Sequence, residues 1–121
     1  MITKAIRFID IGVAEYTDVE VKDPTDDDVI VNIQYTTVSN GTERANLMGH
    51  PNTSVFARQG DNEKPVFPKI LGYSGAGVVE WVGKNVTKVK MGDRVATSSG
   101  YHMKHLVRPE DKVTKIPDNV E

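Results

Sequence analysis

The chain contains three histidines and no cysteine, which excludes disulfides and thiolate metal sites. The remaining imidazole ligands for a metal are His50, His102 and His105. In a strand, His102 and His105 point to opposite faces because they are three residues apart, so they make a poor chelating pair. The pattern favours surface or ordinary polar histidines at these positions.

The segment Ser39-Asn-Gly-Thr-Glu43 gathers hydroxyl, amide and carboxylate groups within five residues. Asn40 and Glu43 have the spacing of a capping box, in which each side chain bonds backbone at the start of a helix. The following residues, 44–48, favour a short helix, and Gly49 is suited to end it. A helix cap and a polar binding site are both compatible with this segment.

Glycine-rich strand sequence from Pro68 to Val95 must position these groups. This stretch holds five of the ten glycines, interspersed with β-branched residues and one tryptophan. Glycine at that density indicates sharp bends or close backbone approach. The stretch therefore predicts a tightly curved sheet of short strands, with Trp81 and Val82 in the core.

Other strands are expected at residues 2–9, 12–21, 29–39, 101–108 and 112–116. The strongest alternation places Val29, Val31, Ile33 and Tyr35 on one face of a half-buried strand. Residues 50–67 show no period and read as a long loop, either a substrate lid with Phe56 and Arg58 as contacts or a disordered segment. The fold class is mostly β, a small barrel or sandwich with a short helix.

The composition describes one domain of 121 residues with a net charge of −2. Interspersed charges argue against a nucleic-acid or anionic-membrane surface. No apolar run is long enough to span a bilayer, and no signal peptide is visible at the N-terminus. We expect a cytoplasmic protein.

Residues 68–83, read as Pro-x-Ile-Leu-Gly-Tyr-Ser-Gly-Ala-Gly-Val-Val-Glu-x-Val-Gly, precede Val-x-x-Gly-Asp-Arg-Val at 89–95. Together these motifs resemble the N-terminal catalytic domain of the medium-chain dehydrogenase/reductase superfamily. The resemblance covers the whole chain and implies a GroES-like partly open β-barrel with one or two short helices. It also implies a Rossmann nucleotide-binding domain after residue 121, which is absent from this chain.

Many members of that superfamily hold a catalytic zinc with a cysteine and a histidine from this domain. By resemblance, those ligands correspond to Asn40 (or Ser39) and Tyr73, which are poor zinc ligands. The cysteine-rich lobe for a structural zinc is missing as well. We therefore expect a zinc-independent protein.

The resemblance also implies roles for side chains near the nicotinamide. Thr42 is expected to bond the substrate oxygen and to pass a proton, and the Tyr73 phenol to replace the Lewis acid. The other implied contacts are Asn40, Gly41 and Glu43 towards the cofactor, and Ser74 with Phe56 and Arg58 towards the substrate. The alternatives are structural roles: a helix cap for Thr42 and its neighbours, and a packed tyrosine at position 73.

Three functions remain open at this point. The first is the substrate-side domain of an NAD(P)-dependent oxidoreductase that acts on a small molecule at an alcohol, a carbonyl or an activated alkene. The second is a stand-alone GroES-like binding module of the co-chaperonin type, and the third is a non-catalytic relative. Gly75-Ala-Gly77 begins like a dinucleotide fingerprint, but Glu80 replaces its third glycine. NAD(P) binding is thus expected mainly in the absent domain, and a homodimer of the full-length protein is a further expectation.

Overall fold

The computed structural model describes residues 1–38, 43–44, 47–48, 70, 72, 74–98 and 101–120. Its elements are the strands β1 (Ile2–Asp10), β2 (Val13–Glu20), β3 (Asp28–Thr36), β4 (Ser74–Val82), β5 (Arg94–Ser98), β6 (His105–Pro109) and β7 (Val113–Lys115), with a 3₁₀ helix at Glu110–Lys112. None of the helical residues in these ranges belongs to a helix long and apolar enough to cross a membrane.

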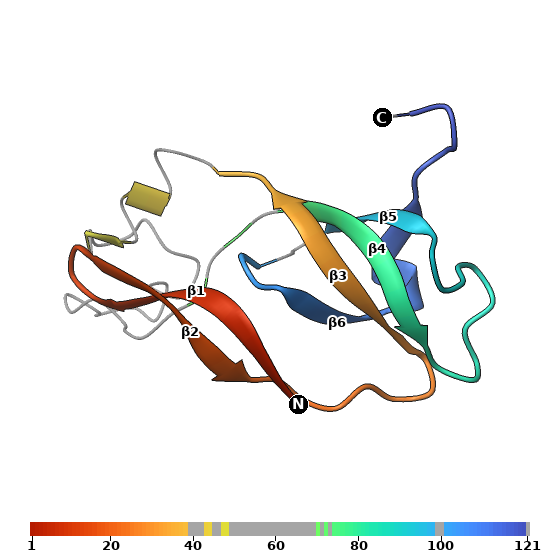
Figure 1. The fold of residues 1–121 in the computed structure, drawn as a ribbon, viewed down its shortest axis with the longest axis horizontal. Coiled ribbons are helices and arrows are strands. Elements are labelled where there is room, and N and C mark those ends of the chain that lie inside the picture. Colours follow the sequence, from red (N-terminus) through yellow and green to blue (C-terminus); the bar gives the residue numbers. More distant parts are fainter. Residues whose placement is uncertain are drawn as a thin grey trace, which may run out of the picture.

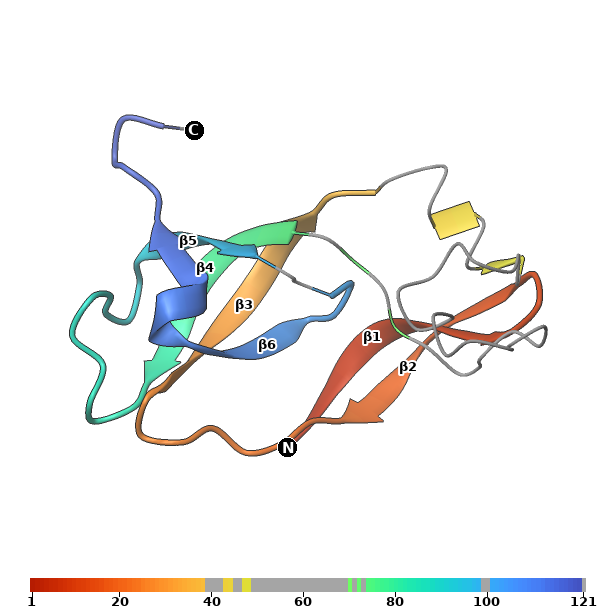
Figure 2. The ribbon, with the colours of Figure 1, turned by 180° about the vertical axis from the view of Figure 1, so that it is seen from behind.

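Strands β3 to β7 form one antiparallel sheet in the order β6-β3-β4-β5-β7, while β1 and β2 form a separate hairpin. The large sheet curls, and the hairpin lies beside its open side (Figures 1 and 2). This arrangement confirms the predicted mostly-β, GroES-like partly open barrel.

The two sheets are joined through the segment that leads into β6. Ala5 of β1 forms an isolated antiparallel bridge with Met103. The Ile6 amide donates to the carbonyl of His102 at 2.8 Å, and the Lys104 amide donates to the carbonyl of Lys4 at 2.7 Å. The same segment therefore fixes His102 between the hairpin and the large sheet.

The core lies between the sheets and consists mainly of β-branched side chains. Its buried members are Ala5, Val19, Val29, Val31, Ile33, Val79, Val89, Val95, Met103, Leu106 and Val113. The predicted alternation of β3 is confirmed as far as Ile33, but Tyr35 is 77% exposed. Ile33 pairs with Gly77 and Tyr35 pairs with Ala76, so β3 has one extra residue between them. This bulge ends the alternation and turns the Tyr35 side chain outward.

A second bulge corrects the prediction that Trp81 belongs to the core. Val31 pairs with Val79 and Ile30 pairs with Trp81, so Glu80 is the extra residue of β4. An extra residue reverses which side chains face inward. Trp81 consequently lies on the outer face and is 37% exposed, while Val82 packs against the core.

The glycines of the central stretch serve curvature and turns, as predicted. A Cβ on Gly77 would lie 2.1 Å from the carbonyl oxygen of Asn32, so only glycine permits this approach of β4 to β3. Gly92 has a φ of 90° in the turn before β5. The Asp93 carboxylate accepts the Lys90 amide at 3.0 Å and lies 3.8 Å from the Lys115 amine, which holds that turn.

Other predicted elements differ in their bounds. The last long strand begins at His105 instead of residue 101, because the preceding residues join the hairpin. The expected turn at residues 109–111 is a 3₁₀ helix, and the short strand after it is confirmed at Val113–Lys115. The helix expected after Asn40 is present at Glu43 and Arg44, where the Met48 amide donates to the Arg44 carbonyl at 2.9 Å.

Candidate functional site

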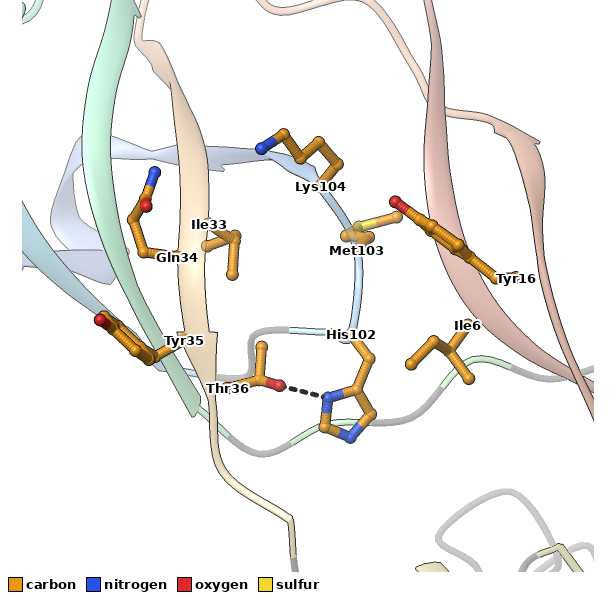
Figure 3. Close-up of a pocket in the computed structure, with 9 residues that line it drawn as sticks. All are labelled: Ile6, Tyr16, Ile33, Gln34, Tyr35, Thr36, His102, Met103 and Lys104. Atoms are coloured by element: carbon orange, nitrogen blue, oxygen red, sulfur yellow. Dashed lines mark hydrogen bonds between the residues drawn. The ribbon is translucent and has the colours of Figure 1, made fainter.

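A hydroxyl, an imidazole and a carboxylate form one hydrogen-bonded chain at the open side of the sheet. The Nδ1 atom of His102 lies 2.6 Å from Oγ1 of Thr36 (Figure 3). On the other side of the ring, Nε2 of His102 bonds Oε1 of Glu43. The His102 and Glu43 side chains are only 9% and 10% exposed, so this imidazole–carboxylate pair is largely desolvated, while Thr36 is partly exposed.

Three separate parts of the chain supply these side chains. Thr36 ends β3, Glu43 belongs to the helical residues that follow, and His102 lies in the segment between β5 and β6. An ionised carboxylate only accepts hydrogen bonds, so Glu43 requires the hydrogen on Nε2 of His102. In the neutral imidazole, Nδ1 is then an acceptor, and the Thr36 hydroxyl donates to it.

Two cavities meet at this chain, one of about 430 Å³ and one of about 380 Å³. Ile6, Thr36 and His102 line both of them. The first is also lined by Tyr16, Ile33, Gln34, Tyr35, Met103 and Lys104, and the second by Phe8, Val38, Glu43, Arg44 and Leu47. Mostly apolar walls with a few convergent polar groups, at this size, are typical of small-molecule sites.

A second hydroxyl–imidazole–carboxylate chain lies elsewhere on the sheet. His105 Nδ1 is 3.0 Å from Oγ1 of Thr3, and His105 Nε2 is 3.2 Å from Oε2 of Glu80. The other oxygen of Glu80 accepts the amide of Asn32 at 2.6 Å. These residues line neither of the two cavities and instead tie β1, β3, β4 and β6 together.

Of the two alternatives expected for His102, a surface position is wrong, because its side chain is 9% exposed and both ring nitrogens are bonded. The other alternative, an ordinary polar histidine, agrees with these bonds. The strand that was expected to hold both histidines begins only at His105, and the two rings have different hydrogen-bond partners. Glu43 lies 59 residues from His102 in the sequence, so no local motif could predict their contact. Glu43 was singled out from the sequence, whereas Thr36 and His102 were missed as site residues.

Most of the predicted site residues lie outside the described residues. These are Thr42 and Tyr73 as catalytic groups, Asn40 and Gly41 as cofactor contacts, and Phe56 and Arg58 as substrate contacts. Ser74 is described, at the start of β4, where its hydroxyl lies 3.1 Å from that of Thr37 and lines neither cavity. The roles proposed for all these residues remain predictions.

Three features of the described residues bear on whether a dinucleotide or a metal ion could be held. Gly75 and Gly77 lie inside β4 and pair with β5, so they open no helix that would receive a dinucleotide pyrophosphate. Within the described ranges, no three histidine or carboxylate side chains gather as a metal site. The cavities have mainly apolar walls, with Lys104 lining the first and Arg44 lining the second.

Comparison with known proteins gives consistent matches. The model of the alcohol dehydrogenase GroES-like domain matches residues 25–118. An alcohol dehydrogenase from Schizosaccharomyces pombe is 42% identical over 82 residues, which are 67% of this chain and 20% of that protein. A quinone oxidoreductase structure from Pseudomonas syringae pv. Tomato DC3000 superposes with a TM-score of 0.69 at 32% identity, covering 98% of this chain and 35% of that one.

A more distant structure shares the fold. It is a protein described as a short chain alcohol dehydrogenase from E. coli CFT073 in complex with the cofactor NADH, with a TM-score of 0.74, 17% identity, and coverage of 99% of this chain and 40% of that one. The chain thus spans only a part of the length of each of these proteins. It belongs to the alcohol dehydrogenase GroES-like domain family of the medium-chain dehydrogenase/reductase superfamily.

Proposed function

We propose that this chain is the substrate-side domain of a zinc-independent, NAD(P)-dependent oxidoreductase. Its reaction is reversible hydride transfer at an alcohol or carbonyl carbon, or to an activated alkene. The observation that carries the proposal is the buried polar chain of Thr36, His102 and Glu43 at the meeting point of two cavities, in a domain of the alcohol dehydrogenase family.

Zinc independence rests on residue chemistry at two positions. By resemblance, Asn40 and Tyr73 stand where relatives place a cysteine and a histidine, and amide and phenol oxygens are poor zinc ligands. Because zinc is the usual Lewis acid for alcohol oxidation, its absence favours quinones and enones as the substrate class. The similarity to the quinone oxidoreductase from Pseudomonas syringae supports this choice, with alcohols and sugars as the alternative substrates.

The roles of the chain's own residues follow from hydrogen bonding. A bound nicotinamide would supply or accept the hydride. Thr42 would hydrogen-bond the substrate oxygen, and the Tyr73 phenol would donate a second hydrogen bond to that oxygen as negative charge develops on it. Asn40 and Gly41 would contact the nicotinamide side, and Phe56, Arg58 and Ser74 would shape the substrate side.

The rest of the proposal concerns the complete protein, in which a C-terminal Rossmann domain would bind most of the dinucleotide. We further propose a cytoplasmic location and a homodimer as its assembly. The matches to alcohol dehydrogenases and a quinone oxidoreductase favour this function over a co-chaperonin-type binding module.

The test is turnover of NADH and NADPH by the full-length protein with a panel of quinones, enones and aldehydes. Thr42→Ala should lower kcat by about 10²-fold, as loss of one hydrogen bond to the developing oxyanion does. Treatment with a chelator should leave the rate unchanged. Absence of turnover with either cofactor would refute the proposed function, and a rate that requires bound zinc would refute zinc independence.

A further inference from the structure

We infer that Thr36, His102 and Glu43 form a proton relay that exchanges a proton with the substrate oxygen during hydride transfer. This inference rests on the proposed function, because it names the route of the proton in that reaction. Thr42 and Tyr73 keep the role of binding the substrate oxygen, and the relay determines where the proton goes.

The Thr36 hydroxyl can accept a hydrogen bond while it donates one to His102. This hydroxyl has one donor and two acceptor positions, and the donor is directed to His102 Nδ1 at 2.6 Å. The acceptor positions are therefore available for a substrate hydroxyl on the cavity side. Thr36 lines both cavities, and Figure 3 shows its hydroxyl beside His102 in the first of them.

The His102 ring receives support on its other side. Its Nε2 bonds the carboxylate of Glu43, which fixes the tautomer and orients the ring. When Nδ1 takes up a proton, the positive ring lies against a carboxylate that is 10% exposed, and little water screens the pair. In catalytic hydroxyl–imidazole–carboxylate triads the carboxylate likewise orients the imidazole and stabilises the imidazolium.

The charges around His102 on the packed elements do not compete with this role. The titratable or charged residues lining the cavities are Tyr16, Tyr35, Glu43, Arg44 and Lys104. Of these, Glu43 bonds the ring, and the Lys104 side chain is directed away from it in Figure 3. Arg44 is exposed, and Tyr16 and Tyr35 are largely exposed, at 62% and 77%.

The proton and the electrons balance as follows. In the oxidation of an alcohol, the hydride leaves the carbon for the nicotinamide, and the hydroxyl proton passes to Thr36 Oγ1. The original Thr36 proton moves to His102 Nδ1, so the products are a carbonyl, the reduced nicotinamide and an imidazolium paired with Glu43. In the reduction of a carbonyl, the imidazolium returns this proton through Thr36 to the oxygen.

The fold provides a matched control in its second chain of Thr3, His105 and Glu80. The same three residue types are joined there by bonds of 3.0 and 3.2 Å, but they line neither cavity. A relay predicts that changes in the first chain reduce turnover while equal changes in the second do not. The second chain is more exposed, with His105 at 29% and Glu80 at 43%. A purely structural role predicts a loss of stability in either chain and no loss of turnover in variants that remain folded.

The experiment compares Thr36→Val with Thr3→Val in the full-length protein, under conditions where circular dichroism shows both to be folded. Thr36→Val should lower kcat by about 10²-fold or more, as loss of a proton-transfer group does. Thr36→Ser should retain a rate close to that of the unchanged protein, because it keeps the hydroxyl, and Thr3→Val should not reduce turnover. Glu43→Gln and Glu80→Gln form a second pair with the same expected contrast.

A readout independent of turnover is the ¹⁵N and ¹H NMR spectrum of the histidine rings. We expect His102 as the Nε2–H tautomer, with a downfield proton signal that Glu43→Gln removes and Glu80→Gln leaves in place. The Nδ1–H tautomer at His102 would overturn the relay.

The outcomes also separate this inference from the proposed function. No turnover by the unchanged protein with either nicotinamide refutes the function. Turnover that is equally fast in Thr36→Val, or reduced equally in Thr36→Val and Thr3→Val, refutes the relay and leaves the function standing.

Discussion

Replacing Gly77 with alanine tests the reasoning that close contact between β3 and β4 shapes the barrel. The added Cβ would lie 2.1 Å from the carbonyl oxygen of Asn32, 2.8 Å from its carbonyl carbon and 3.0 Å from Cα of Ile33. Non-bonded carbon contacts are ordinarily about 3.5 Å or longer, so β3 must move away by roughly 1 Å. All the obstructing atoms belong to backbone, which cannot rotate aside as a side chain does.

The cost follows from this displacement. A shift of roughly 1 Å takes adjacent ladder bonds beyond hydrogen-bond range, and two lost bonds cost about 2 kcal/mol. Overpacking of a tight interface adds about 1–3 kcal/mol. The loss of chain freedom in the unfolded state offsets about 0.4–1 kcal/mol. We therefore expect Gly77→Ala to lower the free energy of unfolding by about 3 kcal/mol, a large part of the roughly 5–15 kcal/mol that holds a domain together.

Equilibrium unfolding in urea measures this change. Trp81 is the sole tryptophan and is 37% exposed, so its fluorescence reports the loss of structure. With a slope of about 2 kcal/mol per M, the midpoint should fall by about 1.5 M. Gly75→Ala is the matched control on the same strand, because its nearest contact is 3.1 Å, and its effect should stay within about 1 kcal/mol. Equal midpoints for the two variants would refute the argument.

Further predictions concern Asp28 and two amines. Asp28 is 3% exposed and accepts the Thr25 amide at 2.8 Å and its hydroxyl at 3.1 Å, so Asp28→Ala should lower the free energy of unfolding by about 1–3 kcal/mol in thermal denaturation. A hydrogen bond to Asp23 raises the pKa of the Met1 amine above 8.0, so its stabilisation is complete below that pH and is lost as the pH rises through the folded pKa. Asp23→Asn should lower the pKa of this amine in an NMR titration and remove that alkaline loss of stability. A hydrogen bond to Asp18 likewise raises the pKa of Lys4, and Asp18→Asn should lower it in the same titration.

The local patterns of the sequence predict most of the architecture because they reflect short-range constraints. Alternation in β3 and the glycines of β4 report which residues face a core and where two strands approach. The bulges at Gln34 and Glu80 are different, because an extra residue is defined only relative to the partner strand. For that reason Tyr35 and Trp81 were predicted to face inward and are found outside.

The candidate site shows the same division between local and long-range information. The motif and the likeness to the family predict a cofactor-facing role for Glu43, which stays a prediction; its side chain is 10% exposed and bonds His102. The burial of His102 could not be predicted, because the carboxylate and the hydroxyl that bond its ring lie 59 and 66 residues away in the sequence. Only the topology that sends residues 101–105 between the two sheets brings these groups together.

That crossing segment has a mechanical consequence. The His102 carbonyl accepts a hydrogen bond from the hairpin, and two residues later the Lys104 carbonyl accepts the Ile33 amide of the large sheet at 2.8 Å. A rocking motion between the sheets is therefore transmitted to the imidazole, while Thr36 moves with the large sheet. An opening of about 1 Å would separate the 2.6 Å pair beyond the range of proton transfer. A change in the angle between the sheets would thus lengthen the Thr36–His102 contact without altering any residue of the site.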